Sequence, residues 1–435
     1  MSRTRRQTSV RIALVGGSQL LQKLVGFLII AIMTRHFPRD DLGEFFLAAA
    51  IGAITAQATE LGTGRHLIRS IARDPTSAPA ELSLVLSLRL PLMLAAYVAV
   101  NLACLAVRPS LSPTLLVVSL YLLLHDLQLA YAAFFVGLER YRLRVAVDVV
   151  GQVLLAGLTL ALARRGGGLH SLLWAYVGAY TAMLAVTTAL VTARFGAVRL
   201  RWSRSRALVV VRRSLPIFGV TLLDALHARA DTILLGFLRP LPEVAAYAAA
   251  YRLLEVSRVG IRPVALIFFP ICVGLAARHD WSGLRRLFGK LARAGLVAGI
   301  GAALLVVAAA GVVVPLVFGP GYADAVPLVR ILFFGAPMLF AGLLAVALIH
   351  TLHLEREAML AGIGCVAANL MLNAVAIPLW GPLGAAVVSI TTQALWTVLL
   401  ARVVLTHLDE SAGPEPSPAE ASSSALEEAR MESVE

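Results

Sequence analysis

The chain has 435 residues, of which 59% are hydrophobic and 14% are charged, and its formal net charge at pH 7 is +13. Soluble domains average about 45–50% apolar and about 25% charged residues, so this composition excludes an ordinary soluble enzyme or binding domain. Apolar runs of roughly 20 residues recur along the chain, and each is long enough to cross a bilayer as a helix. We therefore expect an all-α membrane protein that crosses the membrane many times.

Hydropathy predicts twelve transmembrane helices. The first follows a short arginine-rich start and is too long for the apolar part of a signal peptide, so we expect it to span the membrane. The predicted spans are 12–33, 42–63, 82–107, 113–137, 144–163, 171–193, 214–238, 243–276, 288–317, 326–350, 357–377 and 382–406.

The number of arginines alternates from one predicted loop to the next. Residues 3–11, 65–73, 140–144, 194–213 and 278–293 are rich in arginine, and the intervening loops hold few. Basic residues accumulate on the cytoplasmic side of a membrane protein, so this alternation places both termini in the cytoplasm. It also explains the net charge without nucleic acid as a partner.

The longest basic loop, 194–213, divides the predicted spans into two sets of six. Residues 38–45 resemble 240–247, and 138–140 resemble 354–356, at corresponding hairpins of the two sets. An even number of spans in each set predicts a parallel repeat about an axis along the membrane normal. We expect an N-terminal six-helix lobe (1–200), a C-terminal six-helix lobe (201–407) and an acidic, disordered cytoplasmic tail (408–435).

Motifs typical of catalysis are missing from the sequence. It has no Gly-x-x-x-x-Gly-Lys-Ser/Thr loop for nucleotide phosphates and no Ser-His-Asp arrangement. Cys104, Cys272 and Cys365 lie in apolar runs without metal-ligand spacing, so neither a metal site nor a disulfide framework is expected. We predict that the protein is not an enzyme and has no cofactor.

The seventh and eighth predicted spans carry charge at membrane depth, where a charged side chain costs roughly 2.5–3.5 kcal/mol and usually marks a functional site. The seventh presents one polar face, and Arg229 is predicted to point away from it. Charges on the eighth fall within one wedge, and the first span adds Lys23 near its middle. The polar face comprises Asp224, His227 and Asp231, and the wedge comprises Arg252, Glu255, Arg258 and Arg262.

Two interpretations of these charges remain open. The carboxylates of the seventh and eighth spans could neutralise the arginines and stabilise helix packing. Alternatively, the cations could face a cavity and bind an anionic ligand, because complete pairing leaves Arg262 and one other cation without a partner in the hairpin.

Over residues 8–407 the chain resembles the polysaccharide-unit flippases of the multidrug/oligosaccharidyl-lipid/polysaccharide exporter superfamily. Each matching segment is loose, but they occur in the expected order. They are residues 16–19 with 34–37, residues 229–237 continuing into 244–247, residues 315–319 with Tyr322, and residues 377–386.

This resemblance implies two six-helix lobes around a cavity that opens alternately to each side of the bacterial cytoplasmic membrane. It implies a cargo of undecaprenyl-diphosphate-linked oligosaccharide, moved from the inner to the outer leaflet. Membrane lipids, and a glycan polymerase or glycosyltransferases, are the other expected partners. By position, Lys23, Arg252, Arg258 and Arg262 are the candidates for binding the diphosphate.

The remaining polar residues of the hairpin then have a compensating or coupling role. Arginine stays charged when dehydrated, so acidic neighbours would lower the cost of burying it in the empty protein. We assign this role to Asp224, His227, Asp231 and Glu255. The competing functions are a cation-coupled multidrug exporter of the same fold and a non-transporting scaffold for glycan assembly.

Overall fold

The structure is a computed structural model that describes residues 2–200 and 202–412. Side chains are described throughout these ranges except at 2–16, 18, 19, 204, 213, 216, 217, 257–263, 265, 266 and 412. All regular secondary structure in the described part is helical. The all-α class expected from the sequence is therefore confirmed.

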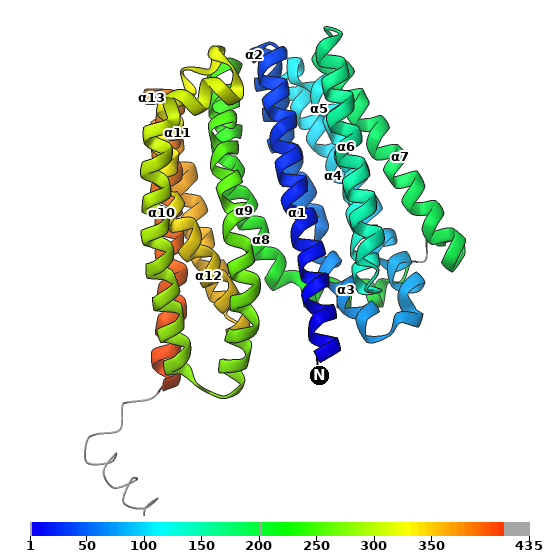
Figure 1. The fold of residues 1–435 in the computed structure, drawn as a ribbon. Coiled ribbons are helices and arrows are strands. Elements are labelled where there is room, and N and C mark those ends of the chain that lie inside the picture. The colour runs from blue at the N-terminus through cyan, green and yellow to red at the C-terminus, as the bar shows by residue number, and fades with distance from the viewer. Residues whose placement is uncertain (1, 201, 413–435) are drawn as a thin grey trace, which may run out of the picture.

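The first part of the chain forms seven helices in succession within the described residues (Figure 1). They are α1 (Ser2–His36), α2 (Arg39–Glu60), α3 (Thr63–Arg73), α4 (Ala78–Val107), α5 (Ser112–Gly137), α6 (Tyr141–Arg164) and α7 (Leu169–Phe195). Short 3-10 turns, η1 (Pro75–Ser77) and η2 (Pro109–Leu111), precede α4 and α5.

The second part continues with α8 (Arg204–Leu238), α9 (Leu241–Ala277), α10 (Trp281–Phe318), α11 (Ala325–Phe333), α12 (Ala336–Leu352) and α13 (Glu355–Ala412), with η3 (Pro320–Tyr322) before α11. The start of α1 and the end of α13 lie at the same end of the molecule (Figure 1). We call this the lower end. The α1–α2 and α8–α9 turns lie at the opposite, upper end.

Within the described residues, seven helical segments are long and apolar enough to cross a membrane, or eight if the bent pair α11 and α12 forms one span. The bend between α11 and α12 is 46° and falls inside the predicted span 326–350. Helices α1, α8 and α9 cover the predicted spans 12–33, 214–238 and 243–276, and each contains residues whose side chains lie outside the description.

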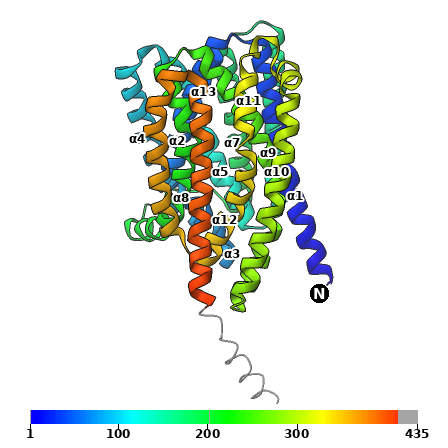
Figure 2. The ribbon, with the colours of Figure 1, turned by 90° about the vertical axis from the view of Figure 1, so that its left-hand side faces the viewer.

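Helix α13 is too long for one crossing. Its 58 residues would extend about 87 Å as a straight helix, against a hydrocarbon thickness of about 30 Å. Gly381, with φ of +56°, breaks it between the predicted spans 357–377 and 382–406. Figure 2 shows the two parts side by side in orange and red, and Asn369 donates a hydrogen bond across them to Thr392 Oγ1 at 3.0 Å.

The predicted span 42–63 extends too far. Helix α2 ends at Glu60, Leu61 adopts a left-handed conformation, and α3 starts at Thr63 as a separate helix. Leu67 and Ile71, four residues apart, are buried on one side of α3, while its arginines occupy other faces. The arginine-rich segment 65–73, predicted to be a loop, is thus a short amphipathic helix.

The turns that begin α2 and α9 share one backbone geometry. Pro38 has φ −56° and ψ 145°, and Pro240 has φ −57° and ψ 146°. These residues start the two segments that the sequence comparison aligned. The other two segments that the sequence comparison aligned are 138–140 and 354–356. The residues with left-handed backbone after α5 and α12 are Glu139 and His353, so in the structure these segments correspond only after a shift of two residues.

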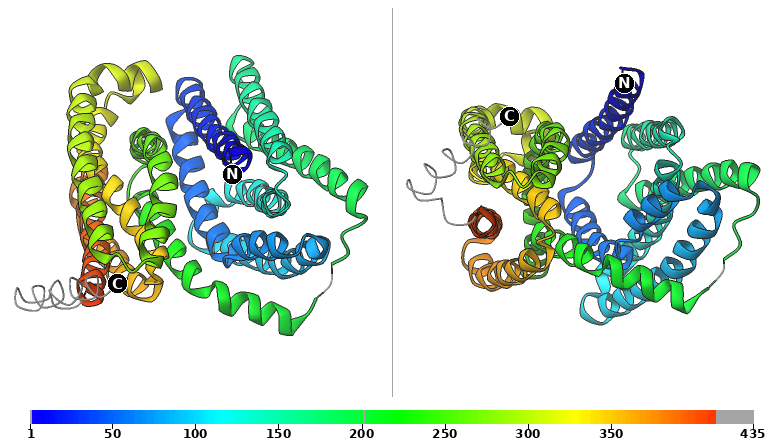
Figure 3. Two further views of the ribbon diagram at one scale, coloured as in Figure 1. Left: turned by 60° about the horizontal axis from the view of Figure 1, so that its bottom comes forward. Right: turned by 90° about the horizontal axis from the view of Figure 1, so that it is seen from below.

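Two groups of helices meet along α2, α8 and α9. Seen from below in Figure 3, α2–α7 gather on one side and α9–α13 on the other, with α1 and α8 at the boundary. Helix α2 packs against both α8 and α9, and α8 packs extensively against α13. Helix α8 therefore contacts the first group of helices on one side and the second group on the other.

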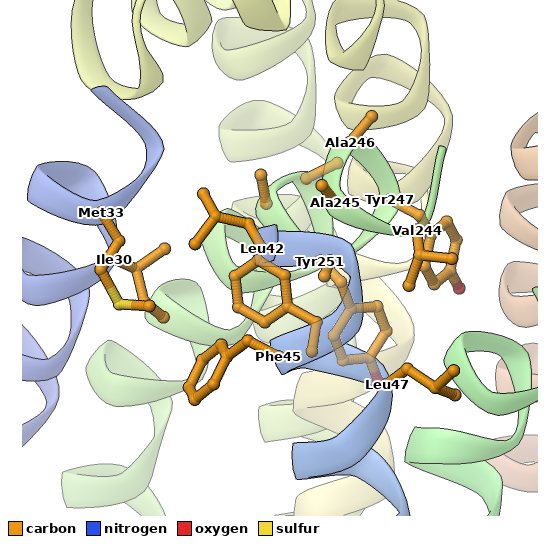
Figure 4. Packing of buried hydrophobic residues seen from close by; sticks show 14 of the residues in the cluster. Ile30, Met33, Leu42, Phe45, Leu47, Val244, Ala245, Ala246, Tyr247 and Tyr251 are labelled. Atoms are coloured by element: carbon orange, nitrogen blue, oxygen red, sulfur yellow. The ribbon is translucent and has the colours of Figure 1, made fainter. Parts of the chain in front are cut away.

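Part of the main hydrophobic core lies where α1, α2 and α9 meet near the upper end. In Figure 4 the side chains of Leu42 and Phe45 lie between Met33 of α1 and Val244 of α9. The α2 and α9 backbones approach so closely here that a Cβ atom on Gly43 would overlap the Leu241 carbonyl. Glycine at position 43 is a requirement of this contact.

Replacing Gly43 by alanine should therefore destabilise the protein by about 1–3 kcal/mol, the usual cost of overpacking a close contact. The matched control is Gly157→Ala in α6, where no atom lies within 4 Å of the added Cβ. That change should be neutral or stabilising by up to about 1 kcal/mol. Thermal unfolding of both purified variants measures the difference, and equal stability of the two would contradict the close contact.

Candidate functional site

A cavity of about 430 Å³ lies between the two groups of helices. Helices α1, α2, α5, α6 and α7 line it from one side, and α8 and α9 line it from the other. Its charged and polar lining comprises Gln22, Lys23, His125, Gln152, Arg229, Thr232, Arg252 and Glu255, together with Tyr121, Tyr176, Tyr180 and Tyr251.

One carboxylate holds two arginines in this cavity. Glu255 Oε1 accepts a hydrogen bond from Arg229 Nη2 of α8 at 3.2 Å, and Glu255 Oε2 accepts one from Arg252 Nη1 at 2.7 Å. The Glu255 side chain is 15% exposed, and those of Arg229 and Arg252 are 29% and 34% exposed. The arginines therefore keep solvent-accessible surface while the carboxylate that orients them is largely enclosed.

Lys23 adds a third cation from the other side of the cavity. Lys23, Arg229 and Arg252 each lie roughly three helical turns from the upper ends of α1, α8 and α9. Among the described lining residues, three cations thus face one carboxylate at similar depth. Their formal sum is +2, with histidine neutral, so the arrangement favours an anionic ligand.

The structure brings together only part of the site predicted from the sequence. Lys23, Arg252 and Glu255 line the cavity. Arg258 and Arg262 belong to α9, but their side chains lie outside the described residues.

Arg229 points away from the polar face of α8, as predicted, but the sequence analysis did not assign it to the cavity. Arg229 and Thr232, three residues apart, form the face of α8 that lines the cavity. The sequence analysis assigned the cavity to the face of α8 with more polar residues, Asp224, His227 and Asp231, and this face does not line the cavity.

The polar face of α8 packs toward α13. Asp231 is 2% exposed; its Oδ2 accepts a hydrogen bond from the Tyr247 hydroxyl and its Oδ1 one from Asn373 Nδ2, both at 2.7 Å. His227 is buried against Trp396, with parallel rings whose centroids are 6.3 Å apart. Asp224 is exposed. None of these three residues lines the cavity.

Hydrogen bonds close the upper end of the molecule between the two groups of helices. Arg39 donates to Asp324 Oδ2 at 2.5 Å, to the Gly321 carbonyl at 2.9 Å and to the Pro242 carbonyl at 3.0 Å. Its guanidinium also lies 5.0 Å from the centre of the Tyr322 ring. We call these contacts the Arg39 clasp.

Two further arginines reinforce this closure. Arg35 Nε donates to the Val317 carbonyl at 3.1 Å, which links α1 to α10. Arg108 donates to the Gly236 carbonyl, which links the end of α4 to α8. In this conformation, then, the first group of helices is joined to the second by arginines at the upper end.

Comparison with known proteins identifies the family. Residues 11–275, more than half of the chain, match the family model described as polysaccharide biosynthesis protein. The chain belongs to this family. No curated protein matches the sequence.

Solved structures share the fold. An inward-facing multidrug resistance transporter of the MATE family, in the MOP superfamily, has a TM-score of 0.73 and 14% identity, with 91% of this chain and 96% of that chain covered. The lipid II flippase MurJ in an inward closed conformation has a TM-score of 0.65 and 11% identity, with 89% and 86% covered.

A third structure is a MOP superfamily transporter from Pyrococcus furiosus whose binding pocket is described as having reverse polarity. It has a TM-score of 0.56 and 14% identity, with 93% of this chain and 95% of that chain covered. At these identities the likeness shows the fold alone. Together with the apolar helices, it identifies a multi-pass membrane protein with the fold of MOP superfamily transporters.

Substitution of Glu255 tests the charge balance of the cavity. Glu255→Gln removes the carboxylate between Arg229 and Arg252, and should lower the stability of the protein by about 1.5–3 kcal/mol, the range for hydrogen bonds to charged groups. Millimolar inorganic pyrophosphate should raise the thermal midpoint of this variant more than that of the unmodified protein, because the anion replaces the lost carboxylate.

The matched control for this test is Glu243→Gln on α9, which removes the ion-pair partner of Arg239. The Glu243 side chain is more exposed than that of Glu255. It should cost less than about 1 kcal/mol and leave the response to pyrophosphate unchanged. An equal response of the two variants would show that the anion does not bind at the cavity arginines.

Proposed function

We propose that the protein is a flippase that moves an undecaprenyl-diphosphate-linked oligosaccharide from the inner to the outer leaflet by alternating access. The observation that carries this proposal is the arrangement of Arg229 and Arg252 on the single carboxylate of Glu255, with Lys23 across the cavity. The polysaccharide biosynthesis family and the transporter fold support the same function.

Charge compensation explains why such a site suits a diphosphate. A diphosphate diester carries two negative charges, and the described lining of the cavity carries a formal charge of +2. Guanidinium groups bind phosphate oxygens through paired hydrogen bonds and keep their charge when water is excluded. Glu255 neutralises part of the positive charge in the empty cavity and is exchanged for phosphate oxygens when the cargo enters.

We propose twelve transmembrane helices in two six-helix lobes, 1–200 and 201–407, followed by the acidic tail 408–435. The matched backbone at Pro38 and Pro240 and the break of α13 at Gly381 support this division. By the positive-inside rule the lower end faces the cytoplasm of a bacterial inner membrane, with both termini on that side. The upper end, closed by the Arg39 clasp, then faces outward.

This proposal assigns the protein no catalysis and no cofactor. Its further partners are membrane lipids, with a glycan polymerase or glycosyltransferases that make and use the cargo, and not nucleic acid. A multidrug exporter of the same fold is the competing function, but an excess of cavity cations disfavours cationic drugs. A scaffold for glycan assembly would not require buried charge at all.

Transport by purified protein in liposomes tests the function directly. Arg252→Gln and Arg229→Gln should each reduce flipping of a fluorescent undecaprenyl-diphosphate-linked saccharide at least tenfold, because removing a charged partner of a phosphate costs about 1.5–3 kcal/mol. Arg293→Gln in α10, an exposed arginine whose Nε donates to the Gly289 carbonyl, is the matched control and should retain normal rates.

Cells that depend on this protein provide the complementary measurement. The cavity variants should lose a surface glycan while the protein still inserts in the membrane. Intact glycan together with drug sensitivity in a deletion strain would favour the exporter. Normal glycan in a strain carrying Lys23→Ala, Arg229→Ala and Arg252→Ala together would rule out the flippase.

Alternating access requires the Arg39 clasp to open. Arg39→Ala should increase the population of molecules open at the upper end by up to about tenfold. The partly exposed ion pair of Arg39 with Asp324 contributes up to about 1 kcal/mol to the closed state, and the hydrogen bonds of Arg39 to carbonyl groups add to it. The readout is the rate at which an impermeant maleimide, added from outside, labels a Met33→Cys variant whose three native cysteines are replaced. Arg164→Ala, at the exposed upper end of α6, is the control. Equal labelling rates would show that the clasp does not hold the upper end closed.

A further inference from the structure

The cavity has an aromatic wall opposite the arginines. Tyr121 and His125 lie four residues apart on α5, and Tyr176 and Tyr180 lie four residues apart on α7, so each pair shares one helical face. All four side chains line the cavity. We call this set the aromatic wall.

The rings of the aromatic wall support one another. Tyr121 and Tyr180 are stacked, with centroids 6.1 Å apart and an interplanar angle of 14°. Tyr121 meets Tyr176 edge-on at 5.5 Å, and His125 meets Tyr180 edge-on at 5.2 Å. Such geometries are favourable for aromatic pairs. The rings are therefore fixed before any ligand enters, and little conformational entropy remains to be lost on binding.

Packing alone does not account for tyrosine at these positions. Two buried tyrosine hydroxyls elsewhere have protein partners, since Tyr97 donates to Asp126 at 3.5 Å and Tyr247 to Asp231 at 2.7 Å, whereas the Tyr322 hydroxyl is fully enclosed without one. Within the described residues, the hydroxyls of Tyr121 and Tyr180 have no hydrogen-bond partner. Both tyrosines line the cavity, and neither hydroxyl is completely shielded from solvent. These hydroxyls remain available to a ligand in the cavity.

The aromatic wall and the two arginines occupy opposite sides of one space. Tyr121 and Tyr176 come from the first group of helices, whereas Arg229 and Arg252 come from α8 and α9. Arg252 and both tyrosines line the same cavity. A ligand that fills the cavity must therefore contact both sides at once.

We infer that the aromatic wall binds the first sugar of the cargo, a pyranose attached directly to the diphosphate. The C–H groups on one face of a pyranose carry partial positive charge and suit the negative face of an aromatic ring. Its hydroxyls have neighbouring partners in Gln152 and in the tyrosine hydroxyls. The diphosphate then lies against Arg229 and Arg252, and the adjacent ring lies against α5 and α7. This inference rests on the proposed flippase function and adds where the sugar binds.

The experiment compares lipids with and without the sugar. The full-length protein in lipid nanodiscs is titrated with the methyl ester of farnesyl diphosphate, called the bare lipid, and with farnesyl diphosphate carrying one glucose, galactose or N-acetylglucosamine. All of these lipids are diphosphate diesters with two negative charges, so they differ in the sugar and not in charge. The unmodified protein should bind at least one of the sugar-bearing lipids about tenfold more tightly than the bare lipid, the size of effect expected from one aromatic contact.

Variants on the two sides should separate the two contributions. Tyr176→Leu and Tyr180→Leu should reduce the ratio of the affinities for the sugar-bearing and the bare lipid toward one, while leaving the affinity for the bare lipid unchanged. Tyr176→Phe keeps the ring and should keep most of the preference. Arg252→Gln should weaken both lipids by the same factor and preserve their ratio.

Two controls keep the result interpretable. Tyr131→Leu removes a buried tyrosine of α5 that does not line the cavity, and should leave the preference intact. Tyr176 is less buried than Tyr180, so Tyr176→Leu decides the question if Tyr180→Leu does not fold.

The possible outcomes have different meanings. If the unmodified protein shows no preference for any of the three sugars, or if the leucine variants weaken both lipids equally, the aromatic wall does not bind sugar while the flippase remains possible. If neither the bare lipid nor any sugar-bearing lipid binds, the proposed function fails, and the sugar site fails with it.

Discussion

The site depends on one carboxylate that is shared by two arginines. Without Glu255, Arg229 and Arg252 would lie side by side in a partly enclosed cavity, where like charges repel more than they do in bulk water. With it, α8 and α9 are held together and both guanidinium groups retain donors directed at the cavity. A single carboxylate is too little to neutralise the pair, and the proposed binding of an anionic cargo rests on this shortfall. In the proposed function, the same residue stabilises the empty protein and leaves positive charge for the cargo.

The main features of the fold could be predicted from the sequence because they follow from local rules. Long apolar segments without charge form helices of membrane length, and proline or glycine marks their ends, as at Pro38, Pro240 and Gly381. The failures are also local. Helix α3 was taken for a loop because its arginines conceal a two-residue apolar face, Leu67 and Ile71. The 46° bend between α11 and α12 leaves a continuous apolar run in the sequence, so hydropathy does not detect it.

The site was less predictable because side-chain partners come from distant parts of the chain. Asp231 is acidic and membrane-embedded, and by residue type alone it belongs with the cavity. In the structure its partners, Tyr247 and Asn373, lie on α9 and α13 and hold it in the helix packing. No periodicity within α8 reveals that Asn373 is nearby. The aromatic wall escaped notice for a different reason: spacings such as Tyr176 and Tyr180 are typical of any buried helix face, and only the cavity between α5, α7 and α9 distinguishes them.

Helix α8 connects these observations. Its face with His227 and Asp231 is tied to α9 and α13 by buried contacts, and its face with Arg229 lines the cavity. Movement of α8 relative to α5 and α7 would therefore shift the arginines relative to Lys23 and the tyrosines. A ligand that contacts both sides binds best at one separation of the two groups of helices, so binding favours that arrangement over others. When the groups separate at the upper end, the ligand loses one set of contacts, and release follows from the same geometry that permitted binding.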